Sequence, residues 1–204
     1  MDGQEAGLGK RQAEEKGLSD PGNWQRMTPG ELKALIRTIP DFPRPGIQFR
    51  DITPLIAHPQ GLAGAVVLLA ERAEAAGAQA IAGIEARGFI FGAAVAAHLG
   101  IGFIPIRKAG KLPVDTLMAD YALEYGVATI ELDPTCVEAG AHVVLVDDLI
   151  ATGGTAVAGA QLLRQAGARV DHALFVIDLP VLGGTAVLAG QGIAAHALFD
   201  FPGH

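Results

Sequence analysis

The sequence has few of the features that mark secreted, disulfide-stabilised or membrane proteins. Cys136 is its one cysteine, so no intrachain disulfide can form, and nothing suggests a cysteine-based metal site. No apolar run is long enough to cross a bilayer, and no signal-peptide pattern opens the chain. We therefore expect a cytoplasmic protein without a membrane partner.

Positive charge is also scarce. Lys and Arg number 15 against 22 Asp and Glu, a formal net charge of −7, which argues against nucleic-acid binding as the main task. The six histidines are scattered without metal-ligand spacing, so no metal bound directly by the protein is expected. A length of 204 residues fits one α/β domain. Residues 1–26 are polar and lack a sustained apolar period, which predicts a disordered extension before a single domain over 27–204.

One segment, VVLVDDLIATGGTA (143–156), carries the most chemical information. Its apolar start predicts a short buried strand over 143–146, followed by Asp147 and Asp148 in a turn. A small-residue turn over 151–155 then opens into a helix, whose N-terminus offers unpaired N–H groups to an anion such as phosphate. Acids beside a phosphate cradle suit a sugar phosphate. Neither a Walker A loop nor a dinucleotide fingerprint matches, and an ordinary turn with an exposed acid pair is the alternative.

Alternating apolar strands and amphipathic helices predict an α/β fold with a mainly parallel central sheet flanked by helices on both faces. A first helix is expected from Thr28 or Gly30 to Pro40. Carboxyl ends of parallel strands share one sheet edge, so the turn at Glu85, the loop from Arg107 and the turn at Asp147 should converge there. The expected strands are 80–84, 102–106, 143–146 and 173–177, the expected helices 62–77 and 89–99, with a mobile loop over 107–116 and a hairpin over 118–132.

Four segments in order carry a family resemblance: PDFPRPGIQFRDITP (40–54), GIEARGFIFG (83–92), RKAGKLP with LEYG (107–126), and VVLVDDLIATGGTA. The last resembles the phosphoribosyl pyrophosphate (PRPP) loop of the type I phosphoribosyltransferases. Together the four resemble the adenine phosphoribosyltransferases over roughly 32–179, most of the chain. The resemblance implies the type I phosphoribosyltransferase fold, with a small hood formed mainly by 40–55 and the C-terminal region.

The resemblance also implies roles for individual residues. Asp147 and Asp148 would bind the ribose hydroxyls, and Glu124 would handle a proton on the purine. The phosphate of PRPP or AMP would bind at Ala151, Thr152, Gly153, Gly154 and Thr155, the pyrophosphate at Arg87, Gly88, Lys108 and Lys111, and adenine at Ile47, Gln48, Phe49 and Arg50. Mg²⁺ would bind mainly through PRPP, and the protein would be a homodimer.

Several of these residues also have simpler interpretations. Phe49 could pack in the core instead of stacking on a base, and Arg50 could pair with Asp51 or another acid. Lys108 and Lys111 could form a solvated basic face. Glu124, taken alone, would be a solvated residue of an edge strand.

The activity implied is purine salvage, in which the phosphoribosyl group of PRPP is transferred to adenine N9 to give AMP and pyrophosphate. A phosphoribosyltransferase for a 6-oxopurine is one alternative, but such enzymes generally place a lysine late in the chain, and no Lys or Arg follows Arg169. A purine- or PRPP-sensing regulator without turnover is the other. The acidic composition and the short polar N-terminal segment argue against the nucleic-acid surface that a regulator needs.

Overall fold

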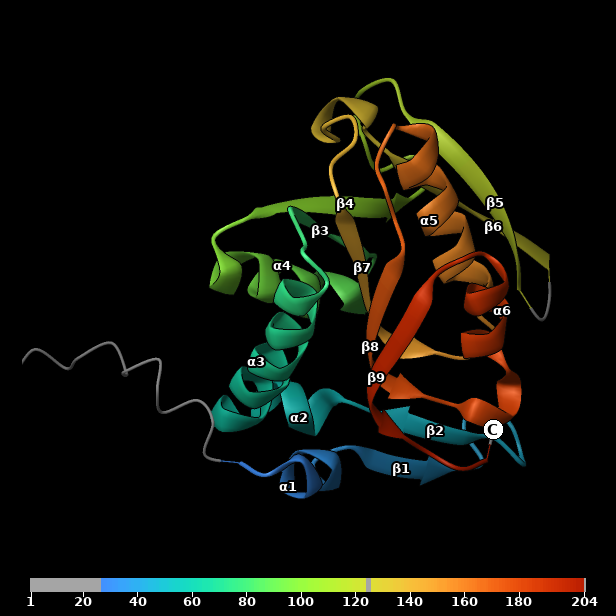
Figure 1. Cartoon of the computed structure of the whole chain (residues 1–204). Coiled ribbons are helices and arrows are strands. Elements are labelled where there is room, and N and C mark those ends of the chain that lie inside the picture. The colour runs from blue at the N-terminus through green and yellow to red at the C-terminus, as the bar shows by residue number, and fades with distance from the viewer. Residues whose placement is uncertain (1–26, 124–125, 204) are drawn as a thin grey trace, which may run out of the picture.

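The structure is a computed structural model that describes residues 27–123 and 126–203, so the extension predicted over 1–26 lies outside the described residues. Within the described part, seven strands form one sheet in the order β5-β6-β4-β3-β7-β8-β9, and β1 and β2 form a separate small sheet (Figure 1). The strands are β1 Arg37–Pro40, β2 Gln48–Asp51, β3 Ala80–Ile84, β4 Gly102–Lys108, β5 Leu117–Leu123, β6 Gly126–Leu132, β7 Val143–Ile150, β8 His172–Asp178 and β9 Ala194–Asp200.

The large sheet is mainly parallel, as predicted. Strands β4, β3, β7, β8 and β9 pair in parallel register, whereas β5 and β6 form an antiparallel hairpin joined to β4 through β6. The described part of the hairpin is paired up to Leu123 opposite Gly126, and the predicted bend near Gly126 falls beside residues 124–125, outside the described residues. All the parallel strands therefore end at one edge of the sheet.

Helices cover both faces of this sheet. Buried side chains of α1 to α4 form one core cluster with one face, and those of α5 and α6 form a second cluster with the other. Figure 1 shows α3 and α4 on the side opposite α5 and α6. The α-helices are α1 Pro29–Ala34, α2 Thr53–Ala57, α3 Pro59–Ala75, α4 Arg87–Leu99, α5 Gly154–Gln165 and α6 Gly184–Gly190, with short 3₁₀ turns at Pro134–Cys136 and Pro180–Leu182.

The first helix begins as predicted but ends earlier. Thr28 caps it in a reciprocal capping box with Glu31. The prediction that the helix continues to Pro40 was wrong, because it stops at Ala34 and β1 pairs with β2 from Arg37 onward. The β-branched Thr38 and Ile39 and the following proline favour this extended backbone.

Two strands run further than their apolar cores suggested. Strand β4 continues through Arg107 and Lys108, which pair with β6, so the predicted loop begins only at residue 109. Strand β7 continues through Asp147 and Asp148 to Ile150, so the predicted turn at these acids was also wrong. In both cases a neighbouring strand supplies backbone hydrogen bonds beyond the last apolar residue.

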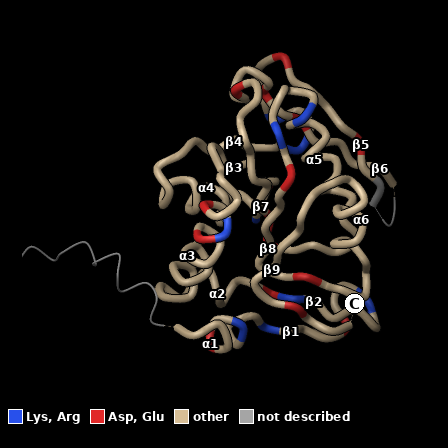
Figure 2. The backbone as a smooth tube through the Cα atoms, in the orientation of Figure 1, with Lys and Arg blue, Asp and Glu red and all other residues tan. Residues whose placement is uncertain are grey.

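The first helix, α1, is attached to the C-terminal segment through Lys33. Lys33 Nζ donates to the carbonyl of Asp200 at 2.7 Å and lies 4.9 Å from the centre of the Phe201 ring. Within the small sheet, Arg37 pairs with Asp51 at 2.5 Å, and Figure 2 shows acidic and basic residues side by side along β1 and β2. The chain thus joins its first and last described elements by charge and cation–π contacts.

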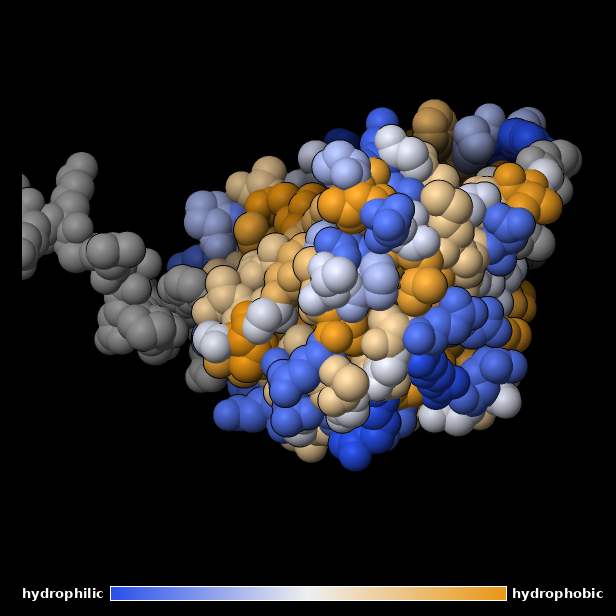
Figure 3. Space-filling model, turned by 90° about the horizontal axis from the view of Figure 1, so that it is seen from above, coloured by the Kyte–Doolittle hydropathy of each residue, from blue (hydrophilic) through white to orange (hydrophobic). Residues whose placement is uncertain are grey.

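The surface mixes polar and apolar residues. On the face seen in Figure 3, hydrophilic and hydrophobic side chains are interspersed. No helix in the described ranges has both the length and the apolar character that crossing a membrane requires.

The packing of β3 against α4 predicts that an alanine substitution lowers stability at Gly83 but not at Gly102. A Cβ atom at Gly83 would lie 2.8 Å from the Phe103 ring and 2.9 Å from the Gly88 carbonyl, whereas one at Gly102 would meet open space. We expect Gly83→Ala to destabilise the protein by about 1–3 kcal/mol, as overpacking does. Gly102→Ala, in the adjacent strand, is the matched control and should keep the parental Tm. Equal Tm values for the two variants would contradict this account of the packing.

Candidate active site

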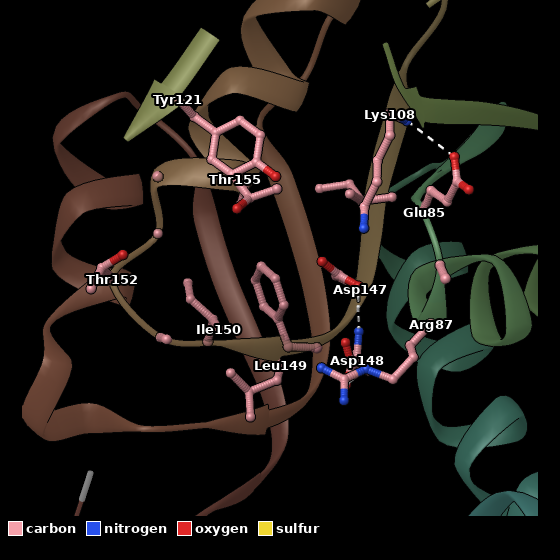
Figure 4. A pocket seen from close by; sticks show the side chains of 17 residues that line it. Glu85, Arg87, Lys108, Tyr121, Asp147, Asp148, Leu149, Ile150, Thr152 and Thr155 are labelled. Atoms are coloured by element: carbon pink, nitrogen blue, oxygen red, sulfur yellow. Dashed lines mark hydrogen bonds and ion pairs between the residues drawn. The ribbon is translucent and has the colours of Figure 1, made fainter. Parts of the chain in front are cut away.

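A pocket of about 550 Å³ lies at the carboxyl edge of the parallel strands. The ends of β3 and β7 and the starts of α4 and α5 form its walls, and β4 and β5 add side chains from the hairpin side (Figure 4). The segments expected to converge there do so. Of the predicted residues, Arg87, Lys108, Asp147, Asp148 and 151–155 all line this pocket.

Two helix N-termini open into the pocket without side-chain caps. Helix α5 starts after Gly153, which has a φ of +84° and leaves the first N–H groups of the helix without a side-chain acceptor. Helix α4 starts after Ala86, again without a side-chain cap. Uncapped N–H groups at the positive ends of two helix dipoles favour two separate anionic groups in one ligand.

The acid pair lies between these helix ends, with Asp148 buried and Asp147 half-buried. Asp148 is 4% exposed, so the alternative of an exposed acid pair was wrong. The Oδ1 atom of Asp147 accepts a hydrogen bond from the Asp148 N–H at 2.9 Å. Strand pairing of β7 with β8 beyond the acids explains this burial.

Burial raises the pKa of both carboxyl groups. Burial, followed by the charge of Asp148, raises the pKa of Asp147 well above its usual range. Burial also raises the pKa of Asp148, and the Arg87 guanidinium opposes that rise. A pocket that holds two such acids is suited to ligand hydroxyls and to positive charge, which both favour the ionised pair.

Arg87, at the start of α4, forms an ion pair with Asp148 of β7. Its Nε atom lies 2.9 Å from Asp148 Oδ2, outside hydrogen-bond geometry, so Asp148 Oδ2 is buried with an ion-pair partner and no hydrogen bond. The next residue, Gly88, lets α4 approach β7, because a Cβ there would lie 2.8 Å from Asp147 Oδ1 and 2.9 Å from the Val146 carbonyl. Gly88 therefore fits as a close-approach residue at the start of α4.

The turn over 151–155 packs closely against the first residue of α6, Gly184. A Cβ at Gly153 would lie 2.9 Å from the carbonyl oxygen of Gly184, in addition to the strain of its positive φ. The N–H of Gly184 in turn donates to the Ala151 carbonyl at 3.0 Å. This contact holds the turn open toward the pocket.

The two predicted lysines differ in placement. Lys108 lines the pocket, and its backbone N–H donates to Glu85 Oε2 at 3.0 Å. Lys111 is exposed and is not among the residues lining the pocket, and its backbone N–H donates to Glu131 Oε1 at 2.7 Å. The geometry thus brings Arg87 and Lys108 together and leaves Lys111 on the neighbouring loop.

A second pocket of about 600 Å³ lies between the small sheet and α4. Phe49 lines it beside Phe42, with the two rings edge to face at 5.2 Å, so Phe49 is not enclosed in the main core. Arg87 lines both pockets, which places this apolar, aromatic pocket next to the acid pair. A flat heteroaromatic ring fits such a surface.

The other residues expected at the base are placed differently. Arg50 donates to Thr38 Oγ1 at 2.5 Å and to the Pro202 carbonyl at 2.6 Å, and it stacks over the Phe201 ring. The side chain thus joins β1 and β2 to the C-terminal segment and lines neither pocket, and a contact of Arg50 with the base stays a prediction. Ile47 and Gln48 line neither pocket, and Glu124 lies outside the described residues.

Sequence reasoning missed several residues that line the first pocket. Glu85 could have been found from its place at the end of a predicted strand, because the carboxyl ends of parallel strands meet at one edge. In the structure it accepts hydrogen bonds from the Lys108 N–H and from Arg107 Nε at 3.2 Å. These donors, the Lys108 N–H first, lower the pKa of Glu85. Tyr121, Leu149 and Phe175 carry no comparable signal, because only the pairing of their strands brings them to the pocket (Figure 4).

Comparison with known proteins agrees with this geometry. The phosphoribosyl transferase domain family matches residues 53–181. An adenine phosphoribosyltransferase of Novosphingobium aromaticivorans is 66% identical over 87% of this chain and 100% of its own length. Among solved structures, the adenine phosphoribosyltransferase of Thermoanaerobacter pseudethanolicus has a TM-score of 0.81 at 44% identity, covering 85% of this chain and 100% of that one. The Saccharomyces cerevisiae enzyme, solved with an imino-altritol bisphosphate and adenine, has a TM-score of 0.80 at 35% identity, covering 87% and 99%. The chain belongs to the phosphoribosyl transferase family and, within it, to the adenine phosphoribosyltransferases.

Proposed function

We propose that this protein transfers the phosphoribosyl group of PRPP to N9 of adenine, releasing pyrophosphate and forming AMP. The observation that carries the proposal is the pair of uncapped helix N-termini on either side of the acid pair. PRPP has the matching chemistry, with a 5′-phosphate at one end of its ribose and a pyrophosphate at the other.

The pocket supports one orientation of PRPP. The 5′-phosphate would lie on the turn and first N–H groups of α5, at 151–155, with the hydroxyls of Thr152 and Thr155 as further donors. The pyrophosphate would lie at the start of α4, at Arg87 and Gly88, with Lys108 facing it across the pocket. Lys111, on the adjacent loop, is proposed to reach the pyrophosphate from there.

Between these ends, Asp147 and Asp148 are proposed to bind the ribose 2′- and 3′-hydroxyls. Bond breaking at C1 of the ribose develops positive charge on the ring, as in an oxocarbenium ion. Two carboxylates held beside the ring stabilise that charge without reorganising, so catalysis rests on placement and electrostatics. No covalent intermediate is required.

The donor set also fits the Mg²⁺ that this chemistry implies. Asp147 and Asp148 supply carboxylate oxygens to the pocket, the hard ligands that Mg²⁺ prefers, and Asp148 Oδ2 already has the Arg87 guanidinium as its ion-pair partner at 2.9 Å. We propose that the ion is held mainly by PRPP oxygens and water, with Asp147 and Asp148 nearby. When bound, it neutralises charge on the departing pyrophosphate.

Adenine is proposed to occupy the pocket lined by Phe42 and Phe49, between the small sheet and Arg87. The small sheet and the C-terminal segment would then be the hood over the base. Glu124 remains a proposed proton-handling group on the purine. A homodimer is proposed from the family resemblance, and a cytoplasmic location from the cysteine content and the lack of a signal-peptide pattern.

The base pocket predicts selectivity for adenine. Adenine presents an amino donor at C6, which a backbone carbonyl of the segment 43–50 can accept, whereas hypoxanthine and guanine present an acceptor there. One unpaired buried group costs about 1–3 kcal/mol, so two mismatches should give adenine at least about a hundredfold advantage in kcat/KM. The measurement is pyrophosphate release with each base at saturating PRPP and Mg²⁺. Equal use of adenine and hypoxanthine would defeat the adenine assignment while leaving the PRPP site intact.

The acid pair predicts a catalytic defect without a folding defect. Asp148→Asn should lower kcat by about 10²–10³, the usual cost of removing one preorganised electrostatic group. Its Tm should move by no more than about 2–4 °C, because the amide loses the Arg87 ion pair but also the burial cost of a charge. Glu138→Gln, the same loss of charge at an exposed site, is the control and should match the parent. Parental turnover in Asp148→Asn would remove this carboxylate from the mechanism.

A further inference from the structure

A buried carboxylate outside the pocket organises the loop beside it. The loop 109–116 connects β4 to β5 directly after Lys108 and carries Lys111. Glu131, on β6, stands opposite Arg107 in the antiparallel register of β4 and β6, and it is 1% exposed. An acid of this burial needs partners that replace water.

The partners of Glu131 come from both ends of the loop. Its Oε1 atom accepts the backbone N–H groups of Lys111 at 2.7 Å and of Leu112 at 2.8 Å, and its Oε2 atom faces Thr116 Oγ1 at 3.5 Å. One side chain thus holds the main chain at the start of the loop and contacts a side-chain hydroxyl at its end. Gly110, with a φ of +82°, makes the sharp turn that aims these N–H groups inward.

The same arrangement occurs at the other predicted lysine. Glu85 accepts the backbone N–H of Lys108, as Glu131 accepts that of Lys111. Each lysine therefore has its main chain held by a carboxylate, while its ammonium group is not paired with that carboxylate in the hydrogen bonds and ion pairs of the described residues. This leaves both side chains to serve an anion.

The charge state of Glu131 agrees with this arrangement. Burial raises the pKa of Glu131, but the N–H groups of Lys111, Leu112 and Gly110 and the Thr116 hydroxyl outweigh it and leave the pKa below its usual value. The group is ionised at neutral pH, and charge-assisted hydrogen bonds are about twice as strong as neutral ones.

We propose that Glu131 is a positioning residue for PRPP: it holds the loop 109–116 in the shape that presents Lys111, next to Lys108, to the pyrophosphate. The proposal rests on the proposed function, since it names the anion that these lysines serve. Glu131 itself touches no substrate. Its effect should therefore fall on the substrate that carries the pyrophosphate and spare the base.

Steady-state kinetics of three variants tests the proposal. In Glu131→Ala the loop loses its anchor, and KM for PRPP should rise about tenfold or more, the effect of losing hydrogen bonds to a charged group. KM for adenine should change less than about twofold, because the base pocket lies on the opposite side of Arg87. Glu131→Gln, which keeps one acceptor oxygen without charge, should fall between parent and alanine. Glu138→Gln, an exposed acid, should leave both constants unchanged.

Limited trypsin digestion measures the accessibility of the loop 109–116 independently of catalytic turnover. Cleavage after Lys108 or Lys111 should be faster in Glu131→Ala than in the parent, and PRPP with Mg²⁺ should slow it in the parent. This measurement keeps the two proposals distinguishable: a parent that does not convert adenine refutes the proposed activity, whereas the digestion still tests the anchor. Two outcomes would overturn the positioning role. The first is a Glu131→Ala variant with the parental KM for PRPP and the parental rate of cleavage.

The second is an equal rise in KM for PRPP and KM for adenine, because it would mean general loosening of the fold. Should the alanine variant fail to fold, Glu131→Gln decides by the same two readings.

Discussion

The close approach of α4 to β7 at Gly88 is the constraint on which the rest of the site depends. With no Cβ, Gly88 lets the helix start against Asp147 and the Val146 carbonyl. That approach brings Arg87 to Asp148 and points the uncapped N–H groups of α4 into the same pocket as those of α5. A side chain at residue 88, even a methyl group, would push α4 away from β7. Arg87 would then lie farther from the acid pair, and the N-terminus of α4 farther from that of α5.

Electrostatically, the site concentrates opposite features in a small volume. The protein as a whole is acidic, yet Arg87, Lys108 and two helix N-termini face one pocket. Two carboxylates, one buried and one half-buried, lie between them with raised pKa values. A ligand with anionic ends and a centre that becomes positive complements this order of charges, which is the charge distribution of PRPP as its glycosidic bond to pyrophosphate breaks.

Other acids have structural roles, either holding the main chain beside a lysine or pairing with an arginine within the fold. Glu85 and Glu131 hold the main chain at Lys108 and Lys111, and Asp51 pairs with Arg37. Arg50 is the opposite case, because its guanidinium is used within the fold, on Thr38, Pro202 and the Phe201 ring. Basic residues of the family-like segments thus differ in role: Lys108 lines the pocket, whereas Arg50 is bound within the fold. Only the tertiary contacts of each residue distinguish the two roles.

The sequence by itself determined the fold class and the location of the anion site. Apolar strands and small-residue turns are local patterns, and parallel strands necessarily end at one edge, so Asp147, Arg87 and 151–155 were predicted together from chain order alone. The tertiary structure decided what depends on partners distant in sequence. Strand β4 continues through Lys108 because β6 pairs with it, and the β1 strand replaces the end of a predicted helix because β2 pairs with it. Asp148 is buried and not exposed because β7 stays paired with β8 past the acids. Burial, pairing and side-chain direction are set by residues tens of positions away, and no local pattern contains them.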